Sequence, residues 1–262
     1  MIDLHCHLLP GIDDGPETIT DALAMCSQMV GDGTDTVVAT PHMLTERYRV
    51  ARADILRGVR NLREELAAWD IPLDVRPGAD VMIASDLPAL LRAGSLMTLG
   101  DAGSYVLLEL PHDVIPSGLD DLLYEVQVLG ITPIISHPER HFELQRRPDL
   151  LRPLIERGVL VQVTAASIEG AFGDSARRCG LLLLKTGMAH LCASDAHAPR
   201  GRKPGLSRAR KIVEGLLSPA EARVIFEVNP ARVLAGDSLD TPEAADEAAA
   251  SPKAGRRFFW QR

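Results

Sequence analysis

The sequence predicts an α/β barrel, because short apolar runs alternate with amphipathic stretches from the first residue to about residue 235. The chain has 262 residues, of which 46% are hydrophobic and 24% charged, so it can bury a full core. Seven apolar runs are typical of strands: Ile2–His5, Thr36–Thr40, Leu73–Ile83, Tyr105–Leu110, Ile131–Ser136, Val159–Thr164 and His190–Ser194. Seven strands that alternate with helices favour a (β/α)7 barrel.

The segments between these strands carry apolar residues every three or four positions, as one face of a helix does. The predicted helices are Ile19–Val30, Ala53–Trp69, Gly118–Leu129, Pro148–Arg157, Ser175–Thr186 and Ser207–Leu217. A doubly wound open sheet is the alternative fold. It would usually carry a glycine-rich phosphate turn after the first strand, where this chain has His5-Cys6-His7.

The last stretch of the chain changes composition, since Ala, Glu, Asp, Ser and Pro dominate from residue 236 until an aromatic end at Phe258-Phe259-Trp260. We therefore predict one barrel domain over residues 1–235 and a flexible C-terminal tail over residues 236–262.

Composition also limits the partners and the compartment. A formal charge of −8 argues against binding to nucleic acid or anionic lipid, which normally meet a basic face. No run of about eighteen apolar residues occurs and the first residues lack the pattern of a signal peptide, so we expect no transmembrane segment and a cytoplasmic protein. The four cysteines form no CxxC pair, which fits reduced thiols in that compartment.

Residues that commonly bind metals stand at the carboxyl ends of six of the seven predicted strands. In a barrel these ends converge on the face where active sites are built. The residues are His5 and His7, His42, Asp80, Glu109, His137, and Asp195 with His197. A single residue of this kind at a strand end is more often a capping or solvated group than a metal ligand. Such residues at six strand ends are much less readily explained by coincidence. Strand alternation also points His5 and His7 to one face and Cys6 to the other.

This mixture of imidazoles and carboxylates without thiolates suits Mn²⁺, Fe²⁺ or Zn²⁺. The number of ligands leaves room for two or three ions that share a bridging carboxylate, for which Glu109 is the candidate because its strand is central. The acidic turn Asp13-Asp14-Gly15-Pro16 follows the first strand. We predict Asp14 as a further ligand, with Asp13 as the nearest competitor, although the turn can also be an ordinary helix cap.

Several motifs resemble the PHP (polymerase and histidinol phosphatase) superfamily. They are Met1-Ile2-Asp3-Leu4-His5-Cys6-His7, Asp13-Asp14-Gly15-Pro16, Thr40-Pro41-His42, Ser136-His137-Pro138-Glu139-Arg140, Ala193-Ser194-Asp195-Ala196-His197 and Val228-Asn229-Pro230. More narrowly, they are similar to its manganese-dependent bacterial protein-tyrosine phosphatases of capsular and exopolysaccharide operons. The resemblance covers residues 1–235.

The resemblance implies a distorted barrel with seven strands and a three-metal site formed by His5, His7, Asp14, His42, the acidic residue at position 80, Glu109, His137, Asp195 and His197. It also implies that Arg140 and Arg202 bind phosphate, and that the substrate is a bacterial tyrosine autokinase with a tyrosine-rich tail. Homo-oligomers are a further expectation. The family usually has Glu where this chain has Asp80, so the carboxylate arrives one methylene short and that metal position is expected to be shifted or weakly occupied.

A cysteine-based tyrosine phosphatase is excluded, because none of the four cysteines begins a Cys-x5-Arg phosphate loop. If the chain removes phosphate from tyrosine, a metal-bound hydroxide must make the attack. The main alternative is a small-molecule phosphatase such as a histidinol phosphatase, which could use the same ions and arginines.

Two other classes fit less well. A catalytically silent module would be expected to have a broken ligand set, and only Asp80 departs here. A nuclease is disfavoured by the acidic balance and by the aromatic content of 4%.

Overall fold

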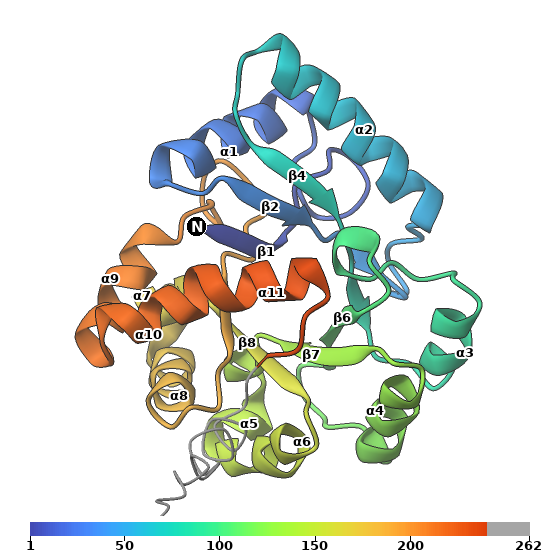
Figure 1. The fold of residues 1–262 in the computed structure, drawn as a ribbon, viewed down its shortest axis with the longest axis vertical. Helices are drawn as coiled ribbons and strands as arrows, with labels where there is room; N and C mark the ends of the chain where they lie inside the picture. The colour runs from blue at the N-terminus through green and yellow to red at the C-terminus, as the bar shows by residue number, and fades with distance from the viewer. Residues whose placement is uncertain (240–262) are drawn as a thin grey trace, which may run out of the picture.

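A computed structural model describes residues 1–239 and shows parallel strands surrounded by helices (Figure 1). The strands are β1 (Ile2–Cys6), β2 (Thr36–Ala39), β3 (His42–Met43), β4 (Asp74–Pro77), β5 (Asp80–Met82), β6 (Tyr105–Glu109), β7 (Thr132–Ser136), β8 (Leu160–Thr164) and β9 (Leu191–Ala193). They form two parallel sheets, with strand orders β1-β2-β4 and β3-β5-β6-β7-β8-β9. The predicted α/β architecture is thus confirmed.

The helices follow the strands in the predicted alternation. The longer ones are α1 (Ile19–Asp32), α2 (Arg52–Ala68), α4 (Leu119–Val128), α8 (Gly173–Lys185) and α9 (Ser207–Leu216). The shorter ones are α3 (Leu87–Arg92), α5 (Phe142–Arg146), α6 (Arg152–Glu156), α7 (Ala165–Glu169), α10 (Pro219–Arg223) and α11 (Asn229–Ala235), with a π-helical turn at Val224–Val228. Three 3₁₀ turns, Leu99–Asp101, Pro138–Arg140 and Pro148–Leu151, complete the set. Most short helices escaped prediction because they hold too few turns to show a helical period.

The prediction of one strand over Leu73–Ile83 is wrong, since this run forms β4 and β5, separated by Gly78 and Ala79. A Cβ added at Gly78 would lie 2.4 Å from Val38 Cγ1, so the backbone approaches its neighbour too closely for any other residue. A similar break at Thr40 and Pro41 separates β2 from β3, because proline has no N–H to donate to the ladder. Eight of the nine strands within residues 1–239 thus fall in the seven predicted runs, and β3, which has two residues, was not predicted.

Contacts between β1 and the segment after β9 bring the last strand back beside the first. An isolated parallel bridge joins Cys6 to Ala196, and the His7 N–H donates to the Ala196 carbonyl at 2.8 Å. The buried Asp3 carboxylate accepts a hydrogen bond from the Ser194 N–H at 3.0 Å. The strands thus surround a common interior, which gives the predicted distorted barrel.

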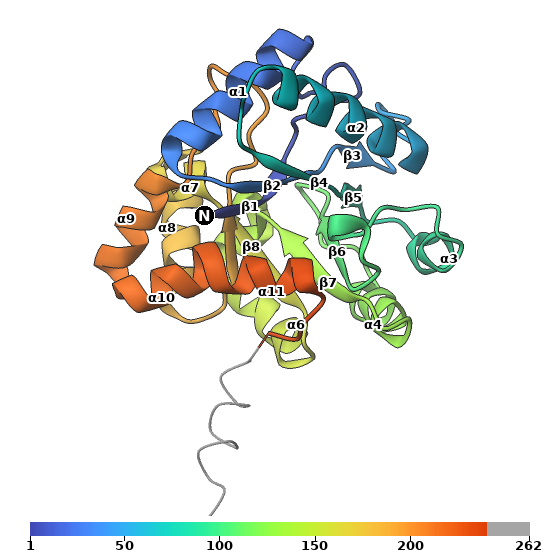
Figure 2. The same ribbon diagram turned by 45° about the horizontal axis from the view of Figure 1, so that its top comes forward.

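The interior of the barrel is apolar toward the amino ends of the strands. One buried cluster contains Leu4, Val38, Leu99, Tyr105, Leu107, Ile134, Leu160, Leu191 and Val233. Helix α11, which supplies Val233, lies beside the start of β1 in both views (Figures 1 and 2). A second, larger cluster packs the outer faces of the strands against the helices. The carboxyl ends of the strands are thereby left as the open end of the interior.

The end of the described chain packs on the barrel. The Tyr105 hydroxyl donates to the Asp237 carbonyl at 2.6 Å, and Leu239 contacts the inner apolar cluster. Residues 240–262, which include the predicted aromatic tip, lie outside the described residues, so a flexible tail stays a prediction for that stretch, whereas Asp237 and Leu239 at the start of the predicted tail contact the barrel. Within residues 1–239, no helix combines the length and hydropathy needed to cross a membrane.

Candidate metal centre

The candidate ligands stand where neighbouring parallel strands end, or directly after them. His5 lies in β1 with His7 just beyond it, Glu109 is the last residue of β6, and His137 follows β7. His42 and Asp80 open the short strands β3 and β5 and face each other in register. Asp195 and His197 follow β9. Strands of very different sequence position thus deliver imidazoles and carboxylates to one end of the interior.

The nine predicted metal ligands come together in four overlapping groups, in each of which the ligand atoms lie within 4.8 Å of one another. The groups are His7, Asp14, His42 and His197; His5, His7 and Asp80; His5, His137 and Asp195; and His42, Asp80 and Glu109. Because His5, His7, His42 and Asp80 each belong to two groups, the groups form one continuous cluster. Such sharing is the geometry that adjacent ions need.

Asp80 links the groups more centrally than Glu109 does. The Asp80 Oδ2 atom lies 3.6 Å from His5 Nε2 and 3.6 Å from His42 Nδ1. Glu109 belongs to one group, with its oxygens 3.4 Å from His42 Nδ1 and 3.6 Å from His137 Nε2. The aspartate side chain therefore reaches the cluster although it is one methylene shorter than glutamate, and the geometry favours Asp80 as the carboxylate shared between groups.

Buried polar atoms without partners indicate that the cluster fits cations. Neither oxygen of Asp80, nor His42 Nδ1, makes a hydrogen bond with any residue in the range 1–239. Buried polar groups in proteins are otherwise nearly always hydrogen-bonded. A divalent ion would supply the missing partner to each of these atoms.

The electrostatics point the same way. Burial, together with the nearby Glu109 carboxylate, raises the pKa of Asp80 well above its ordinary value. Burial and the charge of Asp195 raise the pKa of Glu109 to about 7. Carboxylates crowded in a buried site repel one another, and metal ions relieve that repulsion. The donor set of imidazoles and carboxylates therefore suits divalent metal ions.

Two residues outside the predicted set orient its histidines. The Asp13 Oδ2 atom lies 2.7 Å from His7 Nδ1, and Gln162 Oε1 lies 2.8 Å from His5 Nδ1. Both contacts leave the Nε2 atoms of the histidines facing the cluster, 3.2 Å apart. Partners of this kind fix the tautomer and the ring direction of metal-binding histidines.

The structure thus gives the two acidic residues of the first loop different places. Asp13 also accepts a hydrogen bond from the His42 N–H at 3.1 Å, so it positions two of the candidate ligands, His7 and His42. Asp14, the predicted ligand, approaches His197 Nε2 at 3.3 Å and stands in a ligand group. Gln162 was not identified from the sequence; the signal was a buried polar residue inside the apolar strand β8, which carried no predicted ligand.

Arg140 and Arg202 meet at the edge of the cluster, on Asp195. An Arg140 Nη1 contact and an Arg202 Nη2 contact of 2.5 Å reach the same atom, Asp195 Oδ2. Within residues 1–239, Arg140 forms no ion pair with its sequence neighbours Glu139 and Glu143. Two guanidinium groups beside a cluster of candidate metal ligands are suited to bind the oxygens of a phosphate.

An aromatic ring that the sequence did not single out lies under both arginines. The Cζ atom of Arg140 is 4.5 Å from the centroid of the Phe172 ring, and that of Arg202 is 5.8 Å away. Guanidinium groups are attracted to the face of an aromatic ring at such distances. Phe172, Asp195 and Arg202 also line a cavity of about 230 Å³.

The cysteines have no place in this site. All four are buried and free. Burial raises the pKa of Cys26 and Cys179 to about 12, and those of Cys6 and Cys192 well above the ordinary thiol value. Thiols that stay protonated are poor nucleophiles, which agrees with the absence of a Cys-x5-Arg loop.

A barrel of parallel strands with an imidazole and carboxylate cluster at their carboxyl ends is the architecture of a metal-dependent enzyme. The model of the capsular polysaccharide synthesis family CpsB/CapC matches residues 1–235, and the chain belongs to this family.

Similar proteins agree with this assignment. The tyrosine-protein phosphatase YwqE of Bacillus subtilis is 36% identical over 214 residues, which cover 82% of this chain and 84% of YwqE. The tyrosine-protein phosphatase CpsB of Streptococcus pneumoniae is 26% identical, with 89% of this chain and 98% of CpsB covered.

Solved structures show the same fold. A structure from work on YwqE and CpsB, described there as unique metal-dependent tyrosine phosphatases, superposes with a TM-score of 0.88 at 32% identity, covering 92% of this chain and 96% of that one. A lactonase from Listeria monocytogenes, with a TM-score of 0.55 at 15% identity over 89% of this chain and 94% of its own, shares the fold alone.

Proposed function

We propose that this chain is a metal-dependent protein-tyrosine phosphatase, in which the nine clustered imidazole and carboxylate residues hold two or three divalent ions. The observation that carries the proposal is the convergence of these ligands next to two arginines that share Asp195. Mn²⁺ is the proposed native metal, and Fe²⁺ or Zn²⁺ would fit the same donors. When bound, such ions supply an activated water and neutralise charge on the phosphoryl oxygens.

The arginines bind the substrate in this proposal. A phosphomonoester carries nearly two negative charges, and its equatorial oxygens gain charge in the transition state. Arg140 and Arg202 already lie together on one carboxylate oxygen, so they are placed to hold two oxygens of one phosphate. Planar guanidinium groups offer the paired hydrogen bonds that this recognition requires.

The remaining residues keep this geometry in place. Asp13 and Gln162 fix His7 and His5 through their Nδ1 atoms. Glu109 adds its carboxylate beside His42 and His137. Because His5, His7 and Gln162 are buried and held before substrate arrives, little reorganisation is needed at the moment of reaction.

The family assignment supports a proposal for the physiological setting. We propose a bacterial tyrosine autokinase that controls polysaccharide synthesis as the substrate, a cytoplasmic location, and assembly into homo-oligomers. The family name connects the chain to capsular polysaccharide synthesis, and the similar proteins YwqE and CpsB are named tyrosine-protein phosphatases.

Steady-state assays with three substrates test the proposal. A phosphotyrosine peptide, a phosphoserine peptide and histidinol phosphate should be compared after chelation and after addition of Mn²⁺. We expect hydrolysis of the phosphotyrosine peptide, its loss on chelation and its recovery with Mn²⁺. A higher kcat/KM for histidinol phosphate would favour the small-molecule phosphatase instead, and activity that survives complete removal of metal would refute the metal mechanism.

A further inference from the structure

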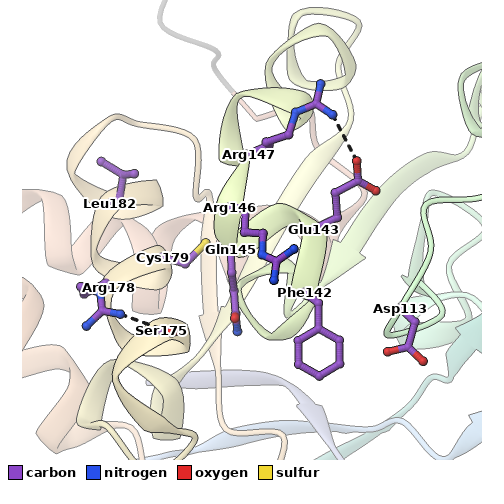
Figure 3. Close-up of a pocket in the computed structure, with 10 residues that line it drawn as sticks. All are labelled: Asp113, Phe142, Glu143, Gln145, Arg146, Arg147, Ser175, Arg178, Cys179 and Leu182. Atoms are coloured by element: carbon purple, nitrogen blue, oxygen red, sulfur yellow. Dashed lines mark hydrogen bonds and ion pairs between the residues drawn. The ribbon is translucent and has the colours of Figure 1, made fainter.

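A wide groove lies between α5 and α8, outside the metal centre (Figure 3). Its volume is about 1060 Å³, compared with about 230 Å³ for the cavity beside Phe172. We call it the α5–α8 groove and define it by Phe142 and Arg146 of α5 and by Arg178 and Leu182 of α8. Nothing in the proposed chemistry uses these side chains.

The groove begins at the phosphate-binding end of the metal centre. Arg140, which contacts Asp195, precedes the first residue of α5 by two positions. Phe172, whose ring lies under Arg140, directly precedes the first residue of α8. Both walls of the groove therefore start at the place where a phosphate would be held, so a chain attached to that phosphate can continue along the groove.

The groove contains two arginine side chains that have no acidic partner among the described residues. Arg146 is exposed and makes no hydrogen bond or ion pair with the described residues, and Arg178 bonds only to the Ser175 hydroxyl, at 3.3 Å. Of the two carboxylates that line the groove, Glu143 is paired with Arg147 at 3.3 Å, which leaves Asp113. An excess of positive charge here contrasts with the net charge of −8 for the whole chain.

The same groove exposes apolar surface. Phe142 is 60% exposed and Leu182 is 43% exposed, although most large apolar side chains of the described residues are buried. Figure 3 shows Phe142 and Arg146 among the residues that line the groove. An exposed aromatic ring in the same groove as arginines without acidic partners is typical of a surface that contacts another polypeptide.

We propose that the α5–α8 groove binds the polypeptide segment that flanks the phosphotyrosine of the substrate, and that this segment carries acidic side chains for Arg146 and Arg178. This inference rests on the proposed function and adds the substrate class: phosphotyrosine within an acidic sequence. Arg146 and Arg178 speed the association of the peptide and set its position in the groove. They take no part in the chemical step at the metal centre.

Charge reversal in the groove tests this proposal. The probes are a phosphotyrosine peptide with three flanking aspartates, a matched peptide with three lysines, and 4-nitrophenyl phosphate, which has no peptide. The variant is Arg146→Glu with Arg178→Glu. The control is Arg60→Glu with Arg92→Glu, two exposed arginines on α2 and α3, away from the groove.

We expect the parent and the control to prefer the acidic peptide by about three- to tenfold in kcat/KM at low salt, the effect of two exposed ion pairs. The groove variant should lose or invert this preference, and salt near 0.5 M should remove it in the parent. Hydrolysis of 4-nitrophenyl phosphate should stay within twofold in all three proteins. Equal rates for both peptides in the parent, or the same loss in the control, would overturn the proposal.

Binding measured without turnover separates this inference from the proposed function. Fluorescence anisotropy with the same two peptides, each carrying a non-hydrolysable phosphonate in place of the phosphate, reports on the groove even if the phosphate is never cleaved. Failure to hydrolyse any phosphotyrosine substrate with Mn²⁺ would refute the proposed function. Equal affinity of the phosphonate peptides for the parent would refute the groove.

Discussion

The two ends of the barrel interior are built from the same strands but from opposite kinds of residues. Toward the amino ends, β6 and β7 contribute Leu107 and Ile134 to an apolar cluster in which both are at most 1% exposed. Toward the carboxyl ends, the same strands lead to Glu109 and His137, which are almost as deeply buried. Two or three residues along a strand thus separate well-packed hydrocarbon from crowded polar groups.

This difference separates stability from function within one interior. Burial of each large apolar side chain contributes about 1.5–3 kcal/mol to folding. Buried polar atoms without partners, such as the oxygens of Asp80, cost free energy instead. The backbone adds to that cost, because His137 and Asp195 have positive φ angles of 33° and 51°. Packing at the apolar end must therefore offset the unfavourable folding free energy of the polar end.

The largest expected effect concerns Asp80, at the polar end. Asp80→Asn keeps the size of the side chain but removes the charge that two ligand groups share. We expect kcat/KM for a phosphotyrosine peptide to fall by about two to three orders of magnitude, with at least one ion lost per chain, because ligating carboxylates are needed to hold the ions. Elemental analysis and steady-state kinetics measure both.

Asp80→Asn also tests whether the polar end of the interior lowers the stability of the fold. In chelator, Asp80→Asn should leave the thermal midpoint unchanged or raise it, because its pKa is raised and its charge is uncompensated without metal. A variant with full metal content and near-normal activity would show that Asp80 does not link the groups. Asp80→Glu is the matched control, and it should retain the ions.

Leu107→Ala probes the apolar end on the same sheet. Removal of this buried side chain should lower the free energy of unfolding by about 2–5 kcal/mol, because the rigid interior only partly closes the cavity. Chemical denaturation in the presence of Mn²⁺ measures the loss. Among molecules that remain folded, metal content and kcat should stay near those of the parent; a parallel loss of metal would mean that the two ends are not independent.

The arginines at the rim should matter to turnover and little to stability. Arg140→Ala and Arg202→Ala should each reduce transition-state stabilisation by about 2–4 kcal/mol, the range for loss of a preorganised charge contact. Arg140→Lys should recover part of this loss, since lysine lacks the planar fork. The comparison is kcat/KM under saturating Mn²⁺. If both alanine variants remain within threefold of the parent, the phosphate site must be assigned to other residues.

A smaller effect is expected at Phe172, which positions the two guanidinium groups. Phe172→Leu retains much of the volume but removes the aromatic face, so kcat/KM should fall by about three- to tenfold, the size of a partly exposed cation–π contact. Phe172→Tyr retains the ring and should stay near the parent. Rescue by tyrosine, together with a rise in KM for phosphotyrosine peptide in the leucine variant, distinguishes positioning from a packing defect. Equal loss in both variants would contradict this role.

The smallest effect is expected from the cysteines. Each of the four Cys→Ser changes should leave kcat within a few fold, because the thiols are buried, protonated and outside the cluster. Loss of several orders of magnitude from one change, with metal content intact, would show that the nucleophile has been assigned wrongly.

The alternation of strands and helices, and the residue types at the strand ends, could be predicted from the sequence alone. Both are local properties: side chains repeat every two residues in a strand and every 3.6 in a helix, so the pattern is legible without the fold. Short helices such as α5, and the break between β4 and β5, lack enough repeats or depend on a close approach to Val38, so they could not be predicted.

Which polar groups come into contact depends on how the strands and helices pack. The contact between His5 and Gln162 joins residues 157 positions apart, and the ring of Phe172 reaches Arg140 and Arg202 from different connections between strands. The order of the strands and their relative register set such pairs, and no periodicity along the chain encodes them. For the same reason the sequence could supply nine candidate ligands, but only the packed barrel places Asp80 between two groups and Asp13 behind His7.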